Sequence, residues 1–232
     1  MYQGTPTKVL TGEVRLSYVH LNEPYKNPKT PNAPAKYSVT LLIPKTDTAT
    51  KNDIDQSIQA AYEQGVKDKW HNLRPTLANP LIYDGDGRRR DGSEFTEECK
   101  GHWVITASSS DKRKPQVVDI SNIKTELAPQ DVYSGMYARV TINFFPFDTA
   151  GNKGVGCGLG NVLKIRDGEP LSGGASAASD FAGLGQAPEA APVPQMGQPY
   201  PAAGPQPQGY AYPQMGQPAM NLSIDPITGM PR

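Results

Sequence analysis

Three groups of cations and several aromatic side chains are the residues of this chain best suited to hold a ligand. The cations fall in turn-rich segments, and Tyr25 and Tyr83 lie in the same segments. A protein that binds single strands without sequence preference needs cations along the backbone and aromatic faces on which bases stack, each stack being worth roughly 1–3 kcal/mol. The candidate DNA-binding residues in these segments are Tyr25, Lys26, Lys29, Tyr83, Arg88, Arg89, Arg90, Lys112, Arg113 and Lys114.

The segment 137–147, YARVTINFFPF, adds three candidates. Its alternation places Ala138 and its apolar neighbours on one face of a strand and Tyr137, Arg139 and Phe145 on the other. An outward face with two aromatic rings and a guanidinium indicates a binding surface, and we expect these three residues to line a groove for single-stranded DNA. Two alternatives stay open, since the same face could pack under a helix or form a dimer contact.

The acidic segment from Asp84 to Glu94 could hold a metal ion. Its start, Asp-Gly-Asp-Gly, is similar to a calcium loop, but Arg88, Arg89 and Phe95 occupy positions where that loop needs other residues. We therefore predict a charged, solvent-facing loop. The alternative is a metal-dependent nuclease that uses these carboxylates to hold magnesium.

No other segment carries a recognisable catalytic or metal-binding pattern. Cys99, Cys157 and the three histidines do not form the paired spacing of a zinc site. The glycine-rich segment 154–160 lies inside a strand pattern with no helix after it, so it predicts a strand that bends, bulges or lets another backbone approach rather than a phosphate-binding loop. We predict no catalytic residues, no metal and no cofactor.

The elements that position these residues are mostly strands. Alternating patterns predict strands over 8–20, 36–43, 102–110, 137–147 and 153–165, with a further short strand over 117–123. In the first of these, Val14, Leu16 and Tyr18 should point to the core. Prolines and asparagines predict a long loop over 22–34. The stretch 71–98 has little period, and its part 80–95 predicts an exposed loop or loose hairpin.

One segment has the period of an amphipathic helix. Over 47–70, Ile54, Ala61 and Val66 recur at helical spacing, and Asp47 or Thr48 can cap the start. Trp70 and Trp103 are predicted core residues. Five or six strands with one helix and long loops predict a mainly β fold, an OB-type five-stranded β-barrel, with an open α+β sandwich as the alternative.

Composition divides the chain at about residue 171. From 172 to 232 Pro, Gly, Ala and Gln replace large apolar residues, which predicts a disordered tail after a single domain over 1–171. The net charge of zero hides a tail near −2 and a body near +2. No apolar stretch predicts a signal peptide or a membrane span, so we expect a cytoplasmic protein.

Five segments make the body recognisable. They are GEVRLSYVHL, KYSVTLLIPK, GHWVITASSSDKRKPQVVD, SGMYARVTINFFPFD and KGVGCGLGNVLKIRDGEPL, which together extend over nearly all of 8–171. The body resembles a family of bacteriophage single-stranded-DNA-binding proteins found in phage replication modules. The resemblance implies an OB fold, sequence-independent binding of single-stranded DNA, and, for a phage protein, the host cytoplasm. The tail departs from the acidic tip common among replication single-strand binders, because it ends in MNLSIDPITGMPR.

These observations together predict a binding protein rather than an enzyme. It would protect and melt single strands in phage DNA replication or recombination. Its tail could recruit replication or recombination proteins, and its exposed strand edges could pair into homo-oligomers. The two alternatives are the nuclease described above and an interaction scaffold that works through its tail.

Overall fold

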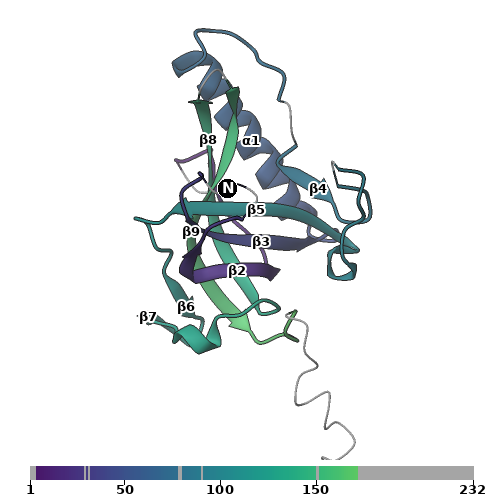
Figure 1. Cartoon of the computed structure of the whole chain (residues 1–232), viewed down its shortest axis with the longest axis vertical. Helices are drawn as coiled ribbons and strands as arrows, with labels where there is room; N and C mark the ends of the chain where they lie inside the picture. The colour runs from purple at the N-terminus through teal and green to yellow at the C-terminus, as the bar shows by residue number, and fades with distance from the viewer. Residues whose placement is uncertain are drawn as a thin grey trace, which may run out of the picture. The chain divides into compact units, whose positions relative to one another are not determined.

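The computed structural model of this chain describes residues 4–28, 30, 32–77, 80–89, 91–149 and 152–171. Within them lie one long helix, two single-turn 3₁₀ helices and nine strands (Figure 1). In chain order they are β1 (Lys8–Leu10), β2 (Val14–Tyr25), β3 (Lys36–Pro44), α1 (Thr48–Asp68), β4 (Ile82–Asp84), η1 (Glu97–Cys99), β5 (His102–Ser110), β6 (Val117–Asp119), β7 (Asn122–Glu126), η2 (Pro129–Asp131), β8 (Tyr137–Thr149) and β9 (Asn152–Arg166). None of the described helices is long and apolar enough to cross a membrane.

Five of the strands close into a ring. β2 pairs with β3, β3 with β5, β9 with β8, and β8 returns to β2, all antiparallel. β5 meets β9 in parallel through one bridge, Ser108 to Gly158. Strands β2, β3 and β5 run across the long β8–β9 hairpin (Figure 1). This ring and the single long helix confirm the predicted mainly β, OB-like architecture.

Strand β8 supplies the clearest example of how the sequence specifies the core. Ala138, Val140, Ile142 and Phe144 are at most 1 % exposed, whereas Arg139 and Phe145 on the opposite face are exposed. The predicted alternation is confirmed, because successive residues of a strand point to opposite faces of the sheet.

Helix α1 packs against β8 and seals that side of the core. Asp47 caps its start, since a carboxylate oxygen accepts a hydrogen bond from the Thr50 amide at 3.0 Å, as predicted. Trp70 lies just past the helix end, fully buried, and donates from Nε1 to the Phe147 carbonyl at 3.0 Å. Its ring lies on Gly65, where an added Cβ would come within 2.6 Å of it. Glycine is therefore needed here for packing.

The glycine-rich strand β9 has a related explanation. Side chains of β8 lie across it, and a Cβ added at Gly154 or Gly156 would come within 2.7 Å of the Phe147 or the Phe145 ring, respectively. At these two glycines the close approach is made by side chains of the neighbouring strand and not, as expected, by another backbone. Aromatic rings that cover glycines on a paired strand also help to fix strand register.

The prediction for the N-terminal strand was wrong at Tyr18. The structure has two strands, β1 and β2, and β2 continues through Tyr25 into the predicted loop. Its register to β3 shifts between Ser17 and His20, and Tyr18 adopts a φ of +47°. Such a bulge turns the next side chain to the other face, so Tyr18 is 55 % exposed instead of buried.

Two smaller differences concern the middle of the chain. The predicted short strand over 117–123 is a hairpin of β6 and β7. Trp103 is only half-buried: its ring packs against the main core, on the same side of β5 as Ile105, and Lys45 Nζ at 5.2 Å and Lys51 Nζ at 4.8 Å lie over it. A tryptophan covered by lysines can remain at the surface.

Candidate nucleic-acid interface

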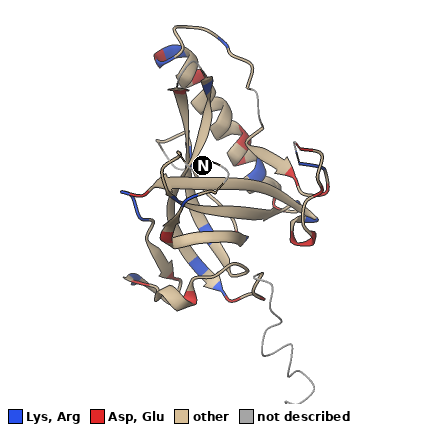
Figure 2. Ribbon diagram, viewed as in Figure 1, with Lys and Arg blue, Asp and Glu red and all other residues tan. Residues whose placement is uncertain are grey.

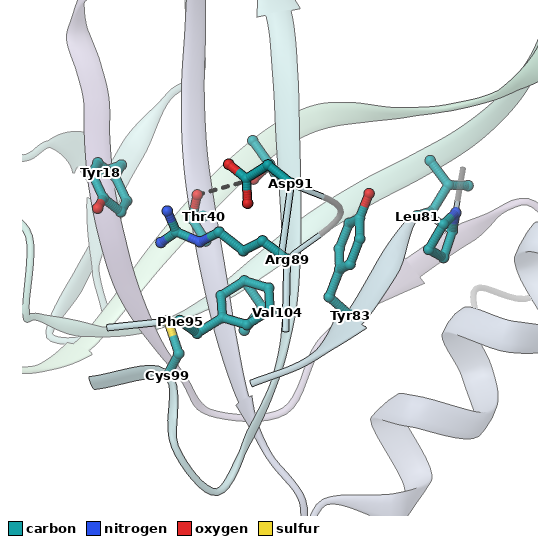
Figure 3. A pocket seen from close by; sticks show the side chains of 11 residues that line it. Tyr18, Thr40, Leu81, Tyr83, Arg89, Asp91, Phe95, Cys99 and Val104 are labelled. Carbon is teal, nitrogen blue, oxygen red and sulfur yellow. Dashed lines mark hydrogen bonds between the residues drawn. The ribbon is translucent and has the colours of Figure 1, made fainter. Parts of the chain in front are cut away.

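Two adjoining hollows lie on the outer face of β2, β3 and β5, and they share Tyr18, Thr40 and Thr106. We call them together the β3–β5 groove. The first hollow, of about 890 Å³, is lined by Tyr18, Thr40, Pro80, Leu81, Tyr83, Arg89, Asp91, Phe95, Cys99, Val104 and Thr106 (Figure 3). The second, of about 360 Å³, is lined by Tyr18, His20, Tyr25, Asn27, Thr30, Ala33, Pro34, Lys36, Ser38, Thr40, Thr106 and Ser108.

One side of the first hollow is formed by two aromatic rings and a guanidinium group. The rings of Tyr83 and Phe95 are 6.1 Å apart and inclined by 55°. The guanidinium of Arg89 lies 5.1 Å from the Phe95 ring centre, and the two side chains lie side by side in Figure 3. Leu42 and Val104 form part of the small apolar cluster beneath these rings, which fixes their position.

Tyr18 stands where the two hollows meet. Across from it, the hydroxyls of Thr40 on β3 and Thr106 on β5 are hydrogen-bonded at 3.0 Å (Figure 3). The centre of the groove therefore combines an exposed aromatic ring with hydroxyl groups. Backbone strain such as the positive φ of Tyr18 concentrates at functional sites, which agrees with a role for this ring.

The second hollow holds another pair of rings. His20 and Tyr25 are stacked with their centres 4.3 Å apart and their planes inclined by 13°. Partial burial lowers the pKa of His20 below its ordinary value, so the imidazole is neutral at pH 7 and presents an uncharged aromatic surface. Lys36, at the start of β3, adds a positive charge to the same hollow.

A cluster of ion pairs anchors the hairpin that carries Arg89 and Phe95. Lys45 Nζ lies 2.6 Å from Asp84 Oδ1 and 2.6 Å from Asp86 Oδ2, and the Gly101 amide donates to Asp86 Oδ1 at 2.8 Å. The hydrogen bond from Lys45 is the main cause that lowers the pKa of both carboxyl groups; the Asp86 amide adds to it for Asp84 and the Gly101 amide for Asp86. Gly85 permits the tight turn, since a Cβ there would come within 1.9 Å of the Cys99 carbonyl oxygen.

This cluster explains the acidic segment that sequence reasoning weighed as a magnesium site. Asp84 and Asp86 hold Lys45, and Glu94 pairs with Arg88 at 3.3 Å. Among the described residues no group of carboxylates, histidines or cysteines is arranged to hold a metal ion. The carboxylates thus shape the hairpin.

The sequence-predicted residues fall into three places. Tyr25, Tyr83 and Arg89 line the β3–β5 groove. Exposed Lys26 directly follows Tyr25 at the end of β2, and exposed Arg88 lies beside Arg89 on the hairpin. Two further candidates, Lys29 and Arg90, lie outside the described residues.

A separate hollow of about 400 Å³ lies on the outer face of β8 and β9 and brings together Phe145, Arg113 and Lys114. We call it the Phe145 hollow. Lys112 is exposed on the same turn after β5. In Figure 2 this basic turn and the hairpin after β4 lie at opposite ends of β5. The lining residues are Lys8, Arg113, Lys114, Pro115, Thr141, Ile142, Asn143, Phe145, Gly158, Leu159, Gly160 and Asn161.

The structure does not bring Tyr137 and Arg139 together with Phe145. The Tyr137 ring packs against the Arg166 guanidinium at 3.5 Å, with Arg15 at 5.9 Å. Arg139 donates from Nε to the Thr11 carbonyl at 2.9 Å. Both side chains make contacts within the fold and line neither the β3–β5 groove nor the Phe145 hollow.

Sequence reasoning missed four aromatic or basic residues of the groove, namely Tyr18, His20, Lys36 and Phe95. Phe95 carried a usable signal, because an aromatic residue stands beside three arginines in a turn-rich segment. Tyr18 carried none, since its exposure depends on a bulge that the alternating pattern conceals.

Comparison with known proteins places the chain in a family. Residues 7–191 match the sequence model of a family described as the single-stranded-DNA-binding protein of Enterobacter phage Enc34. The chain belongs to this family. It is 31 % identical over 194 residues to protein p50 of Acyrthosiphon pisum secondary endosymbiont phage 1, a match that covers 78 % of this chain and 96 % of p50.

Solved structures agree with this assignment. The Enc34 single-stranded-DNA-binding protein in complex with single-stranded DNA matches with a TM-score of 0.60 and 30 % identity, over 72 % of this chain and 90 % of that one. Gp2.5, a single-stranded-DNA-binding protein of bacteriophage T7, matches with a TM-score of 0.50 and 18 % identity, over 72 % of this chain and 95 % of that one. At that identity the second match supports the fold alone.

Proposed function

We propose that this chain binds single-stranded DNA in the β3–β5 groove without reading its sequence. The observation that carries the proposal is the row of rings along the groove, Tyr83 and Phe95, then Tyr18, then Tyr25, with cations at both ends. Membership of the Enc34 family supports it directly. In OB folds the corresponding face, that of the second and third strands of the ring, binds oligonucleotides.

The groove is suited to bases and phosphates in turn. Successive bases would stack on the aromatic rings, which accept any base because every base has a π-face. Arg89 would contact phosphates near one end of the groove. Lys36 and Lys26 would contact phosphates near the other end. The activity is binding rather than catalysis, as the family indicates.

In a phage-infected cell such a protein protects single strands and keeps hairpins open during replication or recombination, in the host cytoplasm. We assign this activity to a domain over 1–171. The segment 172–232 would act as a tether, and any recruitment of replication proteins would fall to it.

The test is a titration of the full-length chain with oligothymidine at several salt concentrations. Contact of Arg89, Lys36 and Lys26 with phosphates predicts that log K falls with log salt with a slope of about −2, at about 0.7 per contact on single strands. A duplex of equal length is the control for strand preference. Absent binding, or binding that salt does not weaken, would contradict the proposal.

A chain ending at residue 171 separates this function from a scaffold that works through its tail. We expect the shortened chain to bind oligothymidine with an affinity close to that of the full chain. Complete loss of DNA binding on removal of 172–232 would place the binding activity in the tail instead.

A further inference from the structure

The Phe145 hollow has the chemistry of a second nucleic-acid site. None of its described lining residues is acidic, and Arg113 and Lys114 stand at its rim. Lys114 Nζ is 3.1 Å from Glu126, but both side chains are about half exposed, and such pairs contribute little. The positive charges at this rim are therefore available to a ligand.

The hollow contains an aromatic surface held in place by the strand beneath it. The Phe145 ring lies over Gly156, where an added Cβ would meet three of its carbons at 2.7–3.3 Å. Phe145 is nevertheless 44 % exposed. Because glycine leaves room beneath the ring, the outer side of the ring can accept a stacked base.

The Phe145 hollow adjoins the β3–β5 groove across one strand boundary. Ser108 lines the far end of the groove, and its bridge partner is Gly158, which lines the hollow. Neighbouring β-strands lie about 4.8 Å apart. One nucleotide of an extended DNA strand spans more than this distance. The turn that bears Arg113 begins two residues after Ser108, and the Arg113 amide bonds to the Ser110 carbonyl at 2.9 Å.

We infer that the Phe145 hollow is a second subsite for the same strand, where DNA leaving the groove past Ser108 stacks a base on Phe145 and places phosphates against Arg113 and Lys114. This inference rests on the proposed function. Long oligonucleotides would contact both the β3–β5 groove and the outer face of β8 and β9 at Phe145. Short oligonucleotides would bind in the β3–β5 groove alone.

The test is a series of oligothymidines from roughly 4 to 20 nucleotides, a range that spans the site sizes of OB folds, on the full-length chain. Phe145→Leu removes the aromatic face but keeps an apolar cover over Gly156, and Phe145→Tyr keeps the ring. For the longest oligomers we expect Phe145→Leu to weaken binding about tenfold, while Phe145→Tyr binds like the parent. For the shortest ones all three proteins should bind alike.

Charge is tested in the same series. Combined Arg113→Gln and Lys114→Gln should reduce the magnitude of the salt slope by about 1.4 for long oligomers and leave it unchanged for short ones. The matched control is Lys67→Gln. Lys67 is exposed on α1 and lines neither the β3–β5 groove nor the Phe145 hollow. Thermal unfolding of each variant verifies that the fold is intact.

The outcomes separate the two proposals. If no oligomer of any length binds the parent chain, the proposed function fails. If the parent binds but these variants bind every length normally, the second subsite is refuted. Equal loss at all lengths would also refute it, because Phe145 would then belong to the primary site.

Discussion

Replacing Tyr18 with leucine removes the ring at the junction of the two hollows and tests the groove most directly. An aromatic side chain presents about 200 Å². Since Tyr18 is 55 % exposed, about 110 Å² of it is available to a base. At about 25 cal/mol per Å², full coverage would contribute about 2.7 kcal/mol, within the range measured for base stacking. Leucine retains some apolar contact, so we expect about half of this contribution to be lost, a roughly tenfold loss of affinity that corresponds to about 1.4 kcal/mol.

The stability of the folded protein should change little. Leucine and tyrosine both carry a Cβ, so the cost of the positive φ at position 18 is nearly the same for either residue. Anisotropy of a labelled oligothymidine gives the affinity, and urea unfolding gives the stability. The matched control is Tyr137→Leu, whose ring packs on Arg166 outside the β3–β5 groove and the Phe145 hollow. We expect this control to bind DNA normally.

Two results would refute the reasoning. Normal binding by Tyr18→Leu would mean that DNA does not stack at the centre of the groove. Weakened binding by Tyr137→Leu, with Tyr18→Leu unaffected, would move the site to the outer face of β8, where the sequence alone placed it.

Two further predictions concern the supports of the groove and the core. Gly65→Ala should destabilise the fold by about 1 kcal/mol in urea unfolding, because overlap with the Trp70 ring outweighs the gain of about 1 kcal/mol in helix propensity; a more stable variant would contradict the packing argument. Lys45→Met should lower the melting temperature at pH 7, because Asp84 and Asp86 both lose the cation that they share. The pKa values of these two carboxyl groups are lowered in the fold, so the stabilisation is present above the ordinary carboxyl pKa near 4 and is lost as pH falls below it. The difference in melting temperature between the parent and Lys45→Met should therefore shrink towards pH 3; a constant difference would exclude the ion pairs as its cause.

The sequence by itself determined the elements whose pattern is local. The alternation of β8 specified which face Phe144 buries, and the helical period specified the buried side of α1, with Asp47 or Thr48 as its cap; the structure selects Asp47. These features follow from the geometry of a strand or a helix, which neighbouring residues in the chain already satisfy. The characteristic segments of the body also indicated the phage family of single-strand binders, and the match over residues 7–191 confirms that family.

Only the tertiary structure decided which side chains meet in a groove. A bulge of one residue in β2 turned Tyr18 outward, and no local pattern reports it, because a shift of one residue exchanges the two faces of a strand. Phe95 lines the same hollow as Tyr18 only because strand pairing brings the hairpin after β4 onto the outer face of β5. Phe145 and Tyr137 share a face in sequence but lie eight residues apart on one strand, roughly 26 Å, with different neighbours at each end. A binding surface is made of contacts between distant segments, so its position depends on how the ring closes.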